Sequence, residues 1–173
     1  MQKINVISIV IRHLKTLSHD DGSLVWSDLL TFYLIPVVAG AAFFYFNWRV
    51  PKDAVALSIS VFSIFAALLL SVQVALYSVS LRALPVPEDP KERTAFKGRV
   101  AIRSTVMREL NDNIAYLVLL SVVWVTALLA LFVTSCHGRV ASALVLAMYV
   151  HFFLTLLMVV KRSGIVFSGE YER

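Results

Sequence analysis

Four long apolar runs dominate the chain, and short polar segments separate them. The runs cover residues 29–46, 54–81, 114–135 and 140–160, and none of them contains Asp, Glu, Lys or Arg. About 20 mostly apolar residues are needed to cross a hydrocarbon core of about 30 Å. Inside lipid every backbone polar group must be satisfied within the protein, which favours helices. The pattern therefore predicts an all-α membrane protein with four transmembrane helices.

The connections between these runs predict how the spans are paired. Residues 47–53 and 136–139 are short turns, so we expect two helical hairpins, one from spans 1 and 2 and one from spans 3 and 4. The middle connection is longer and lies on the same side as both termini. The expected parts are an N-terminal segment over 1–28, a four-span domain over 29–160 with the loop 82–113, and a tail over 161–173.

Positive charge is distributed unevenly between the two sides. Of the sixteen lysines and arginines, only Arg49, Lys52 and Arg139 lie in the two short turns. All the others lie in the termini and the 82–113 loop. Because cytoplasmic loops carry an excess of Lys and Arg, both termini and the long loop are predicted to be cytoplasmic.

Two further helices are predicted outside the spans. Ile4, Ile7, Ile11 and Leu14 repeat at helical spacing near the N-terminus. This amphipathic stripe fits a helix on the inner leaflet, or a helix packed on a partner chain. In the long loop, prolines end the second span, and after them only Gly98 weakens a helix. We expect a helix that starts near residue 91 in the cytoplasm and continues into the third span.

Composition excludes several classes of protein. Hydrophobic residues make up 59% of the chain and charged residues 16%. Average soluble domains have about 45–50% apolar and about 25% charged residues, so a soluble globular enzyme is excluded, and so is a disordered chain. The longest segment outside the spans has 32 residues. Chains below about 40 residues rarely fold alone, which leaves no room for a separate catalytic domain.

No catalytic, metal or cofactor motif occurs in the sequence. There is no Ser-His-Asp order, glycine-rich phosphate loop or HExxH pattern. Cys136 and His137 are adjacent, but two neighbouring ligands do not make a tetrahedral zinc site. We therefore expect no enzyme activity, no catalytic residues, no metal and no cofactor.

Polar residues inside the spans are the first candidates for function. Gln73 lies deep in the second span and His151 lies midway along the fourth, and the two side chains could face each other. They could form a proton relay, a gate or a sensor. The alternative is a hydrogen bond that holds helices together. Pro36 is expected to kink the first span, either as a fixed bend or as a hinge.

Small residues predict close helix packing in two spans. Ser63, Ala67, Ser71 and Ala75 form one stripe in the second span, and Gly40 lies at the centre of an AGAA segment in the first. Small residues let another helix approach closely. The partner helix could belong to the same chain or to a second copy, and we consider these residues candidates for oligomer packing.

The strongest polar feature is basic. Six cations lie in the loop before the third span, namely Lys91, Arg93, Lys97, Arg99, Arg103 and Arg108. Such a cluster fits anionic lipid head groups, or the docking of an acidic cytoplasmic protein. Direct nucleic-acid binding would need aromatic stacking platforms, and only Phe96 is available, so we do not expect it.

Two segments carry a resemblance to a known family. Asp28, Phe32 and Pro36 stand at four-residue spacing from the residue before the first span into that span, and Glu109, Asn111 and Asn113 stand just before the third apolar run. In these segments and in its four-span architecture, the chain resembles the small inner-membrane proteins of bacterial anti-phage defence loci, the KwaA-type membrane subunits of Kiwa systems. The resemblance implies a non-enzymatic homo-oligomer, expected to be a tetramer, in the bacterial inner membrane. It also implies that the oligomer senses phage attachment and binds a cytoplasmic effector of the KwaB type.

Three functional hypotheses follow from these observations. The first is an oligomeric sensor and scaffold that recruits and controls a cytoplasmic effector against phage. The second is a homo-oligomeric pore or membrane-depolarising effector, with Gln73 and the serines of the second span facing its lumen. The third is a small multidrug-type transporter, although such carriers usually have an intramembrane acidic residue and these spans have none.

Overall fold

The computed structural model contains only helices in the part of the chain that it describes. It describes residues 6–17, 27, 30–82, 86–87, 89–135 and 138–171, without the side chains of residues 90 and 165–171. The elements are α1 (Ile7–Lys15), the π-helix η1 (Leu30–Leu34), α3 (Ile35–Tyr45), α4 (Lys52–Ser80), α5 (Pro90–Thr134) and α6 (Arg139–Tyr171). Asp28, Cys136, His137 and the first residue of the predicted N-terminal stripe, Ile4, lie outside the described residues.

The prediction of an all-helical fold is confirmed for the described residues, and three of the helices are long and apolar enough to cross a membrane. They are Lys52–Ser80, Lys91–Thr134 and Arg139–Gly164. The predicted first span is represented by a shorter apolar segment, Leu30–Tyr45, in which η1 continues directly into α3.

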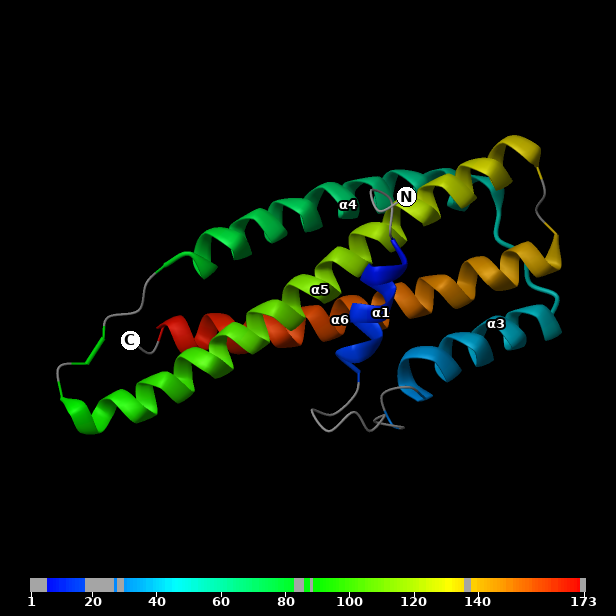
Figure 1. Cartoon of the computed structure of the whole chain (residues 1–173). Helices are drawn as coiled ribbons and strands as arrows, with labels where there is room; N and C mark the ends of the chain where they lie inside the picture. The colour runs from blue at the N-terminus through cyan, green and yellow to red at the C-terminus, as the bar shows by residue number, and fades with distance from the viewer. Residues whose placement is uncertain are drawn as a thin grey trace.

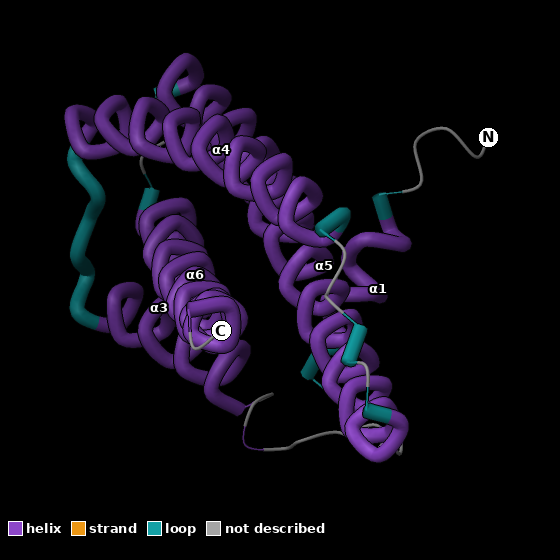
Figure 2. The backbone as a smooth tube through the Cα atoms, turned by 90° about the vertical axis from the view of Figure 1, so that its left-hand side faces the viewer, coloured by secondary structure: helices purple, strands orange, loops and turns teal. Residues whose placement is uncertain are grey.

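The long helices form an elongated bundle with two distinct ends (Figure 1). The end of α4, the start of α5 and the end of α6 lie at one end of the bundle. The turns from α3 to α4 and from α5 to α6 lie at the other. Helix α1 runs across the bundle rather than along it, against α5. Figure 2 shows α3 beside α6 and α4 beside α5, with α1 on the outer side of α5.

Neighbours in space differ from neighbours in sequence. Helix α4 packs along α5, α3 packs along α6, and α5 contacts α6 more lightly. The predicted hairpin of the first two spans is therefore wrong as a packed pair, because α3 and α4 do not contact each other in the described part of the chain. The short turn between them reverses the chain direction but does not bring their side chains together.

The fit of particular side chains explains this pairing. The buried residues of α4 are Val55, Phe62, Leu69 and Leu76, which repeat every seven residues and form one seam against the core. On α3, Gly40 is buried, and a Cβ atom added there would lie 2.9 Å from the backbone oxygen of Ala143 in α6. Only glycine allows that approach, so α3 is specified as a partner of α6.

Helix α5 is continuous over 45 residues. Its N-cap is Asp89, whose carboxylate accepts a hydrogen bond from the backbone N–H of Lys91 at 2.9 Å. Gly98 does not interrupt the helix. The prediction that one helix extends from the basic loop into the third span is thus confirmed. Likewise α6 continues past residue 160, so the predicted tail extends the last helix as far as Tyr171.

The amphipathic N-terminal segment forms α1. His13 is completely buried against α5, and Val10 packs against the core. The predicted apolar stripe faces outward instead, with Ile7, Ile11 and Leu14 exposed. The stripe therefore remains available for a membrane surface or a partner chain, and both alternatives stay predictions.

Candidate functional site

Four polar side chains lie close together on α5, immediately before its longest apolar run. Glu109, Asn111, Asp112 and Asn113, here called the polar hub, occupy little more than one helical turn. Successive residues of an α-helix project about 100° apart. The hub side chains therefore point toward different neighbours, and each of them interacts with another element.

Glu109 connects α5 to α6. Arg162 Nη1 donates a hydrogen bond to Glu109 Oε2 at 3.0 Å, and its Nη2 donates to the backbone oxygen of Thr16 at 3.0 Å. Hydrogen bonds between ionised groups are stronger than neutral ones. One guanidinium thus holds α6, α5 and the end of α1 together.

Asn111 connects α5 to α4. Gln73 Nε2 donates to Asn111 Oδ1 at 3.1 Å. The pairing of Gln73 with His151 that the sequence allowed is not formed, because Gln73 faces α5 and His151 bonds to other groups. Interhelical hydrogen bonds of this kind contribute about 0.6–2 kcal/mol. Gln73 is therefore a link between two helices of the same chain.

Asp112 and Asn113 connect α5 to α1. Arg12 Nε lies 3.6 Å from Asp112 Oδ1 in an ion pair. Asn113 Oδ1 accepts a hydrogen bond from His13 Nδ1 at 2.8 Å and one from the Thr16 hydroxyl, also at 2.8 Å. The docking of α1 on α5 thus depends on polar contacts as well as on apolar ones.

His13 is buried in a way that keeps it neutral. It has no exposed surface, and its ring stacks on that of Tyr116 with centroids 3.8 Å apart and planes within 1°. Burial lowers the pKa of His13 from 6.5 to about 4, although the hydrogen bond to Asn113 acts in the opposite direction. Nearby positive charge, including that of Arg162, lowers it further. His13 Nε2 has no hydrogen-bond partner in the described part of the chain.

Tyr116 connects this region to α6 and, through His151, to η1. The Tyr116 hydroxyl lies 2.8 Å from His151 Nε2, and His151 Nδ1 lies 2.8 Å from the backbone oxygen of Phe32. A carbonyl only accepts, so Nδ1 carries the hydrogen. In the neutral ring, Nε2 then accepts the tyrosine hydrogen. His151 is thus bonded on both sides, to α5 and to η1.

Pro36 explains why the Phe32 carbonyl needs a partner. In a regular helix that oxygen would accept from the N–H of residue 36, which proline lacks. The chain forms the π-helix η1 at this point. His151 then supplies the missing donor. Pro36 and His151, which the sequence marked separately, therefore belong to one arrangement.

The side chains between His13 and Phe32 connect helices by packing and hydrogen bonds, and they do not form a continuous path for a proton. His13 stacks on Tyr116 without a hydrogen bond between the two rings in the described structure, and stacking does not carry a proton. His13, Tyr116 and His151, here called the ring network, link α1, α5, α6 and η1 through packing and two hydrogen bonds. Movement of any one of these elements disturbs the others.

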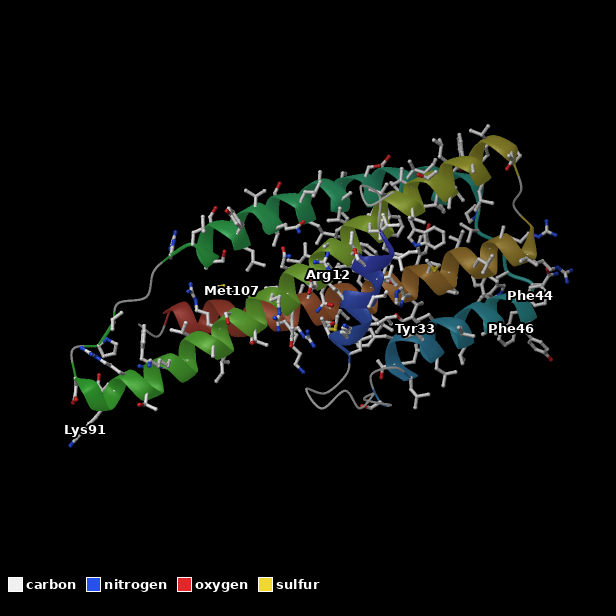
Figure 3. All side chains as sticks on the ribbon, viewed as in Figure 1. Arg12, Tyr33, Phe44, Phe46, Lys91 and Met107 are labelled. Carbon is white, nitrogen blue, oxygen red and sulfur yellow. The ribbon has the colours of Figure 1, made fainter. Side chains whose placement is uncertain are left out.

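The six basic residues of α5 do not form a single surface. Arg93 Nε donates to the Pro87 oxygen at 3.4 Å, and Arg103 Nη2 donates to the Val79 oxygen at 3.1 Å. Lys91, Lys97, Arg99 and Arg108 are exposed. Lys97 and Arg99 are two residues apart and so project about 200° from each other around the helix. Lys91 lies at one end of the molecule, and the aromatic residues Phe44 and Phe46 lie at the other (Figure 3).

The candidates for oligomer packing divide into two groups. Ser63, Ala67, Ser71 and Ala75 are all exposed, outside the buried seam of α4. The stripe is thus not used inside the chain. For Gly40 the assignment to an oligomer interface is wrong, because this residue packs against α6 of its own chain.

The polar hub and the ring network hold helices together, and no metal site is found among the described residues. No group of three or more His, Cys, Asp or Glu in the described residues could hold a metal ion. A comparison of the chain with protein-family models, with curated proteins and with solved structures finds no match. The site is therefore interpreted from its own geometry.

Sequence reasoning missed most of the partners in this site. Gln73, His151 and three hub residues stood out, but His13, Tyr116 and Arg162 did not. One signal was present for His13: it is a titratable residue beside the apolar stripe of a short helix. No pattern indicated that its partner is Asn113, 100 positions later.

Proposed function

We propose that this protein is an oligomeric membrane sensor and scaffold that recruits a cytoplasmic partner through the basic half of α5. The observation that supports this most is the continuity of α5, which joins the membrane segment, the polar hub and the exposed cations Lys91, Lys97 and Arg99 in one helix. A displacement of the membrane segment would therefore be transmitted to the basic end without a flexible joint.

The proposal includes a topology with four spans and both termini in the cytoplasm. The segment Leu30–Tyr45 is too short for an upright span, at about 24 Å for 16 residues, unless residues before it extend the helix. The charge bias supports this orientation, because the short turns hold only three cations. Aromatic residues at the opposite end, including Trp48, fit the membrane–water interface on the non-cytoplasmic side.

The role in anti-phage defence rests on the resemblance to KwaA-type subunits. We propose on that basis that the chain is a tetramer in the bacterial inner membrane and that its partner is an acidic, KwaB-like effector. The exposed small-residue stripe of α4 supports the presence of a second copy, because packing within the chain does not use it. Anionic lipids would contact the remaining cations.

Purification from native host cells in mild detergent, followed by native mass spectrometry, tests the proposal. Three proteins are compared: the wild type, Lys97→Glu/Arg99→Glu, and the matched control Arg49→Glu/Arg139→Glu, which reverses two exposed charges at the other end. We expect the wild type and the control to carry a stoichiometric cytoplasmic protein, and the first variant to lose it. Retention of the protein by the first variant would place the docking surface elsewhere. If only the control lost the cytoplasmic protein, the end with Arg49 and Arg139 would be the cytoplasmic one, opposite to the proposed orientation.

A pore is the second candidate, and one observation favours it. Ser60, Ser63, Ser71 and Ser78 are all exposed on the same side of α4. In a ring of copies these hydroxyls would line a lumen, whereas Gln73 is bonded to Asn111. Leakage of a dye from lipid vesicles that contain the purified protein tests this alternative, because a scaffold does not conduct.

A further inference from the structure

A groove lies between the end of α4, the segment after it and the cytoplasmic half of α5. Its volume is about 630 Å³, within the range of roughly 300–1,000 Å³ that is usual for ligand sites. Half of its twelve lining residues are apolar or aromatic: Leu76, Tyr77, Val86, Phe96, Val100 and Met107. A groove of this kind suits a ligand with a hydrocarbon part.

Three arginines give the same groove a strong positive charge. Arg82, Arg103 and Arg108 line it, and none of its described lining residues is acidic. Arg103 donates to the backbone oxygens of Val79 at 3.1 Å and of Arg82 at 3.4 Å, which fixes its guanidinium at the C-terminus of α4. Arg82 and Arg108 are exposed. The groove therefore combines an apolar floor with cations that suit an anionic group.

The position of the groove indicates where its ligand comes from. Leu76 and Tyr77 belong to the last two turns of the membrane-crossing helix α4, and Asn111 at the other side stands three residues before the apolar run of α5. The groove is open on an apolar side, since its lining residues Tyr77 and Val86 are each more than 60% exposed. A lipid can enter such a groove sideways from the bilayer.

We propose that this groove binds one anionic phospholipid, with the phosphate held by Arg82 and Arg108 and an acyl chain along Tyr77, Val100 and Met107. Basic pockets between transmembrane helices on the cytoplasmic side are typical sites for anionic head groups. An acidic peptide would satisfy the arginines but would leave the apolar side in contact with lipid unexplained. The inference requires a membrane location, and it does not depend on recruitment of a partner protein.

The test measures lipid binding to the full-length protein by native mass spectrometry in detergent. Phosphatidylglycerol and phosphatidylcholine of equal chain length are titrated against the wild type and Arg82→Gln/Arg108→Gln. Lys97→Gln/Arg99→Gln removes the same net charge from α5 outside the groove and serves as the control. Each arginine near a lipid surface contributes about fivefold in affinity, so the groove variant should bind phosphatidylglycerol roughly 30-fold more weakly. The control should keep the preference for the anionic lipid.

A second variant tests the apolar part. Ser104→Trp fills the groove from an exposed position and leaves all three arginines in place. We expect it to reduce the affinity for phosphatidylglycerol by about tenfold or more. This is the effect of leaving about two methylene groups of the acyl chain unburied. Equal losses in the groove variant and the control would mean binding by net charge alone and would overturn the proposal. Undiminished binding in Ser104→Trp would place the lipid outside the groove. The partner-capture experiment has an independent readout, so either proposal can fail alone.

Discussion

Helix α1 should leave α5 as the pH falls, because docking keeps His13 neutral. Burial lowers the pKa of His13 to about 4, whereas a free histidine has a pKa of about 6.5. Because the pKa of His13 is lower in the docked state than in the free state, the docking of α1 is strongest above pH 6.5. The docking equilibrium becomes less favourable as the pH falls from 6.5 to about 4. The cost arises because a proton binds readily to free α1 and poorly to docked α1.

The expected size follows from these two pKa values. At pH 7.5 both states are neutral and the difference vanishes. At pH 5 the free histidine is almost fully protonated, and linkage gives a loss of about 2 kcal/mol, or roughly 30-fold in the docking equilibrium. The ion pair between the exposed Arg12 and the partly buried Asp112 offsets little, since ion pairs near the surface contribute about 0–1 kcal/mol.

Distances between two spin labels on α1 and α5 measure this transition directly. Labels at the exposed positions Ile11 and Arg99, in a Cys136→Ser background, should give one narrow distance distribution at pH 7.5. At pH 5 a broad second population should grow. His13→Gln keeps a donor for Asn113 but does not titrate, so its distribution should not change between these pH values.

The His13→Gln control separates the effect of His13 from that of the other charged or titratable groups that face this site. Glu109 and Asp112 on α5, His151 on α6, and Arg162 all lie around the end of α1. If His13→Gln undocks at the same pH as the wild type, a group other than His13 carries the transition. If the wild type stays docked at pH 4.5, the reasoning from the burial of His13 is refuted.

Three substitutions inside the bundle have expected effects on the melting temperature of the detergent-purified protein. Gly40→Ala should destabilise it by about 1–3 kcal/mol, because the new Cβ meets a backbone oxygen of α6 at 2.9 Å. Gly98→Ala, the matched control in open space, should stabilise it by about 0.5–1 kcal/mol. His151→Leu removes two hydrogen bonds and should cost about 1–3 kcal/mol, whereas Gln73→Leu removes one and should cost about 0.6–2 kcal/mol. A rise in Gly40→Ala, or a larger loss in Gln73→Leu than in His151→Leu, would contradict these contacts.

The long helices could be predicted from sequence because the bilayer imposes one requirement on every span. An apolar run of about 20 residues must be helical, whatever its neighbours are. The bounds of α4 and the continuity of α5 therefore agree with the pattern. Pairing is a different problem, since it depends on single positions. Gly40 attracted attention as a small residue, but its partner Ala143 was indistinguishable from the other alanines of α6.

The candidate site could be predicted only in part, for a related reason. The rarity of polar groups in lipid marks Gln73 and His151, but it does not give their direction around a helix. In the structure Gln73 bonds to Asn111, and His151 bonds to Tyr116 and to Phe32, so the two side chains are not paired with each other. The role of α1 was further hidden, because its apolar stripe suggested that Ile7 and Ile11 make the important contacts. In the structure the buried contact is His13, which lies off that stripe.

The placement of the hub within one turn of α5 has a consequence for any sensing mechanism. Because Glu109, Asn111, Asp112 and Asn113 bond to three different helices, rotation of α5 about its axis would break all of these interactions together. A gradual twist is therefore costly, and α5 should move together with α1, α4 and α6 or separate from them as one event. The ring network adds η1 and the helix α3 that continues it to this unit through His151. A disturbance that shifts α3 against α6 would thus reach the basic end of α5 by displacing a rigid helix and releasing α1.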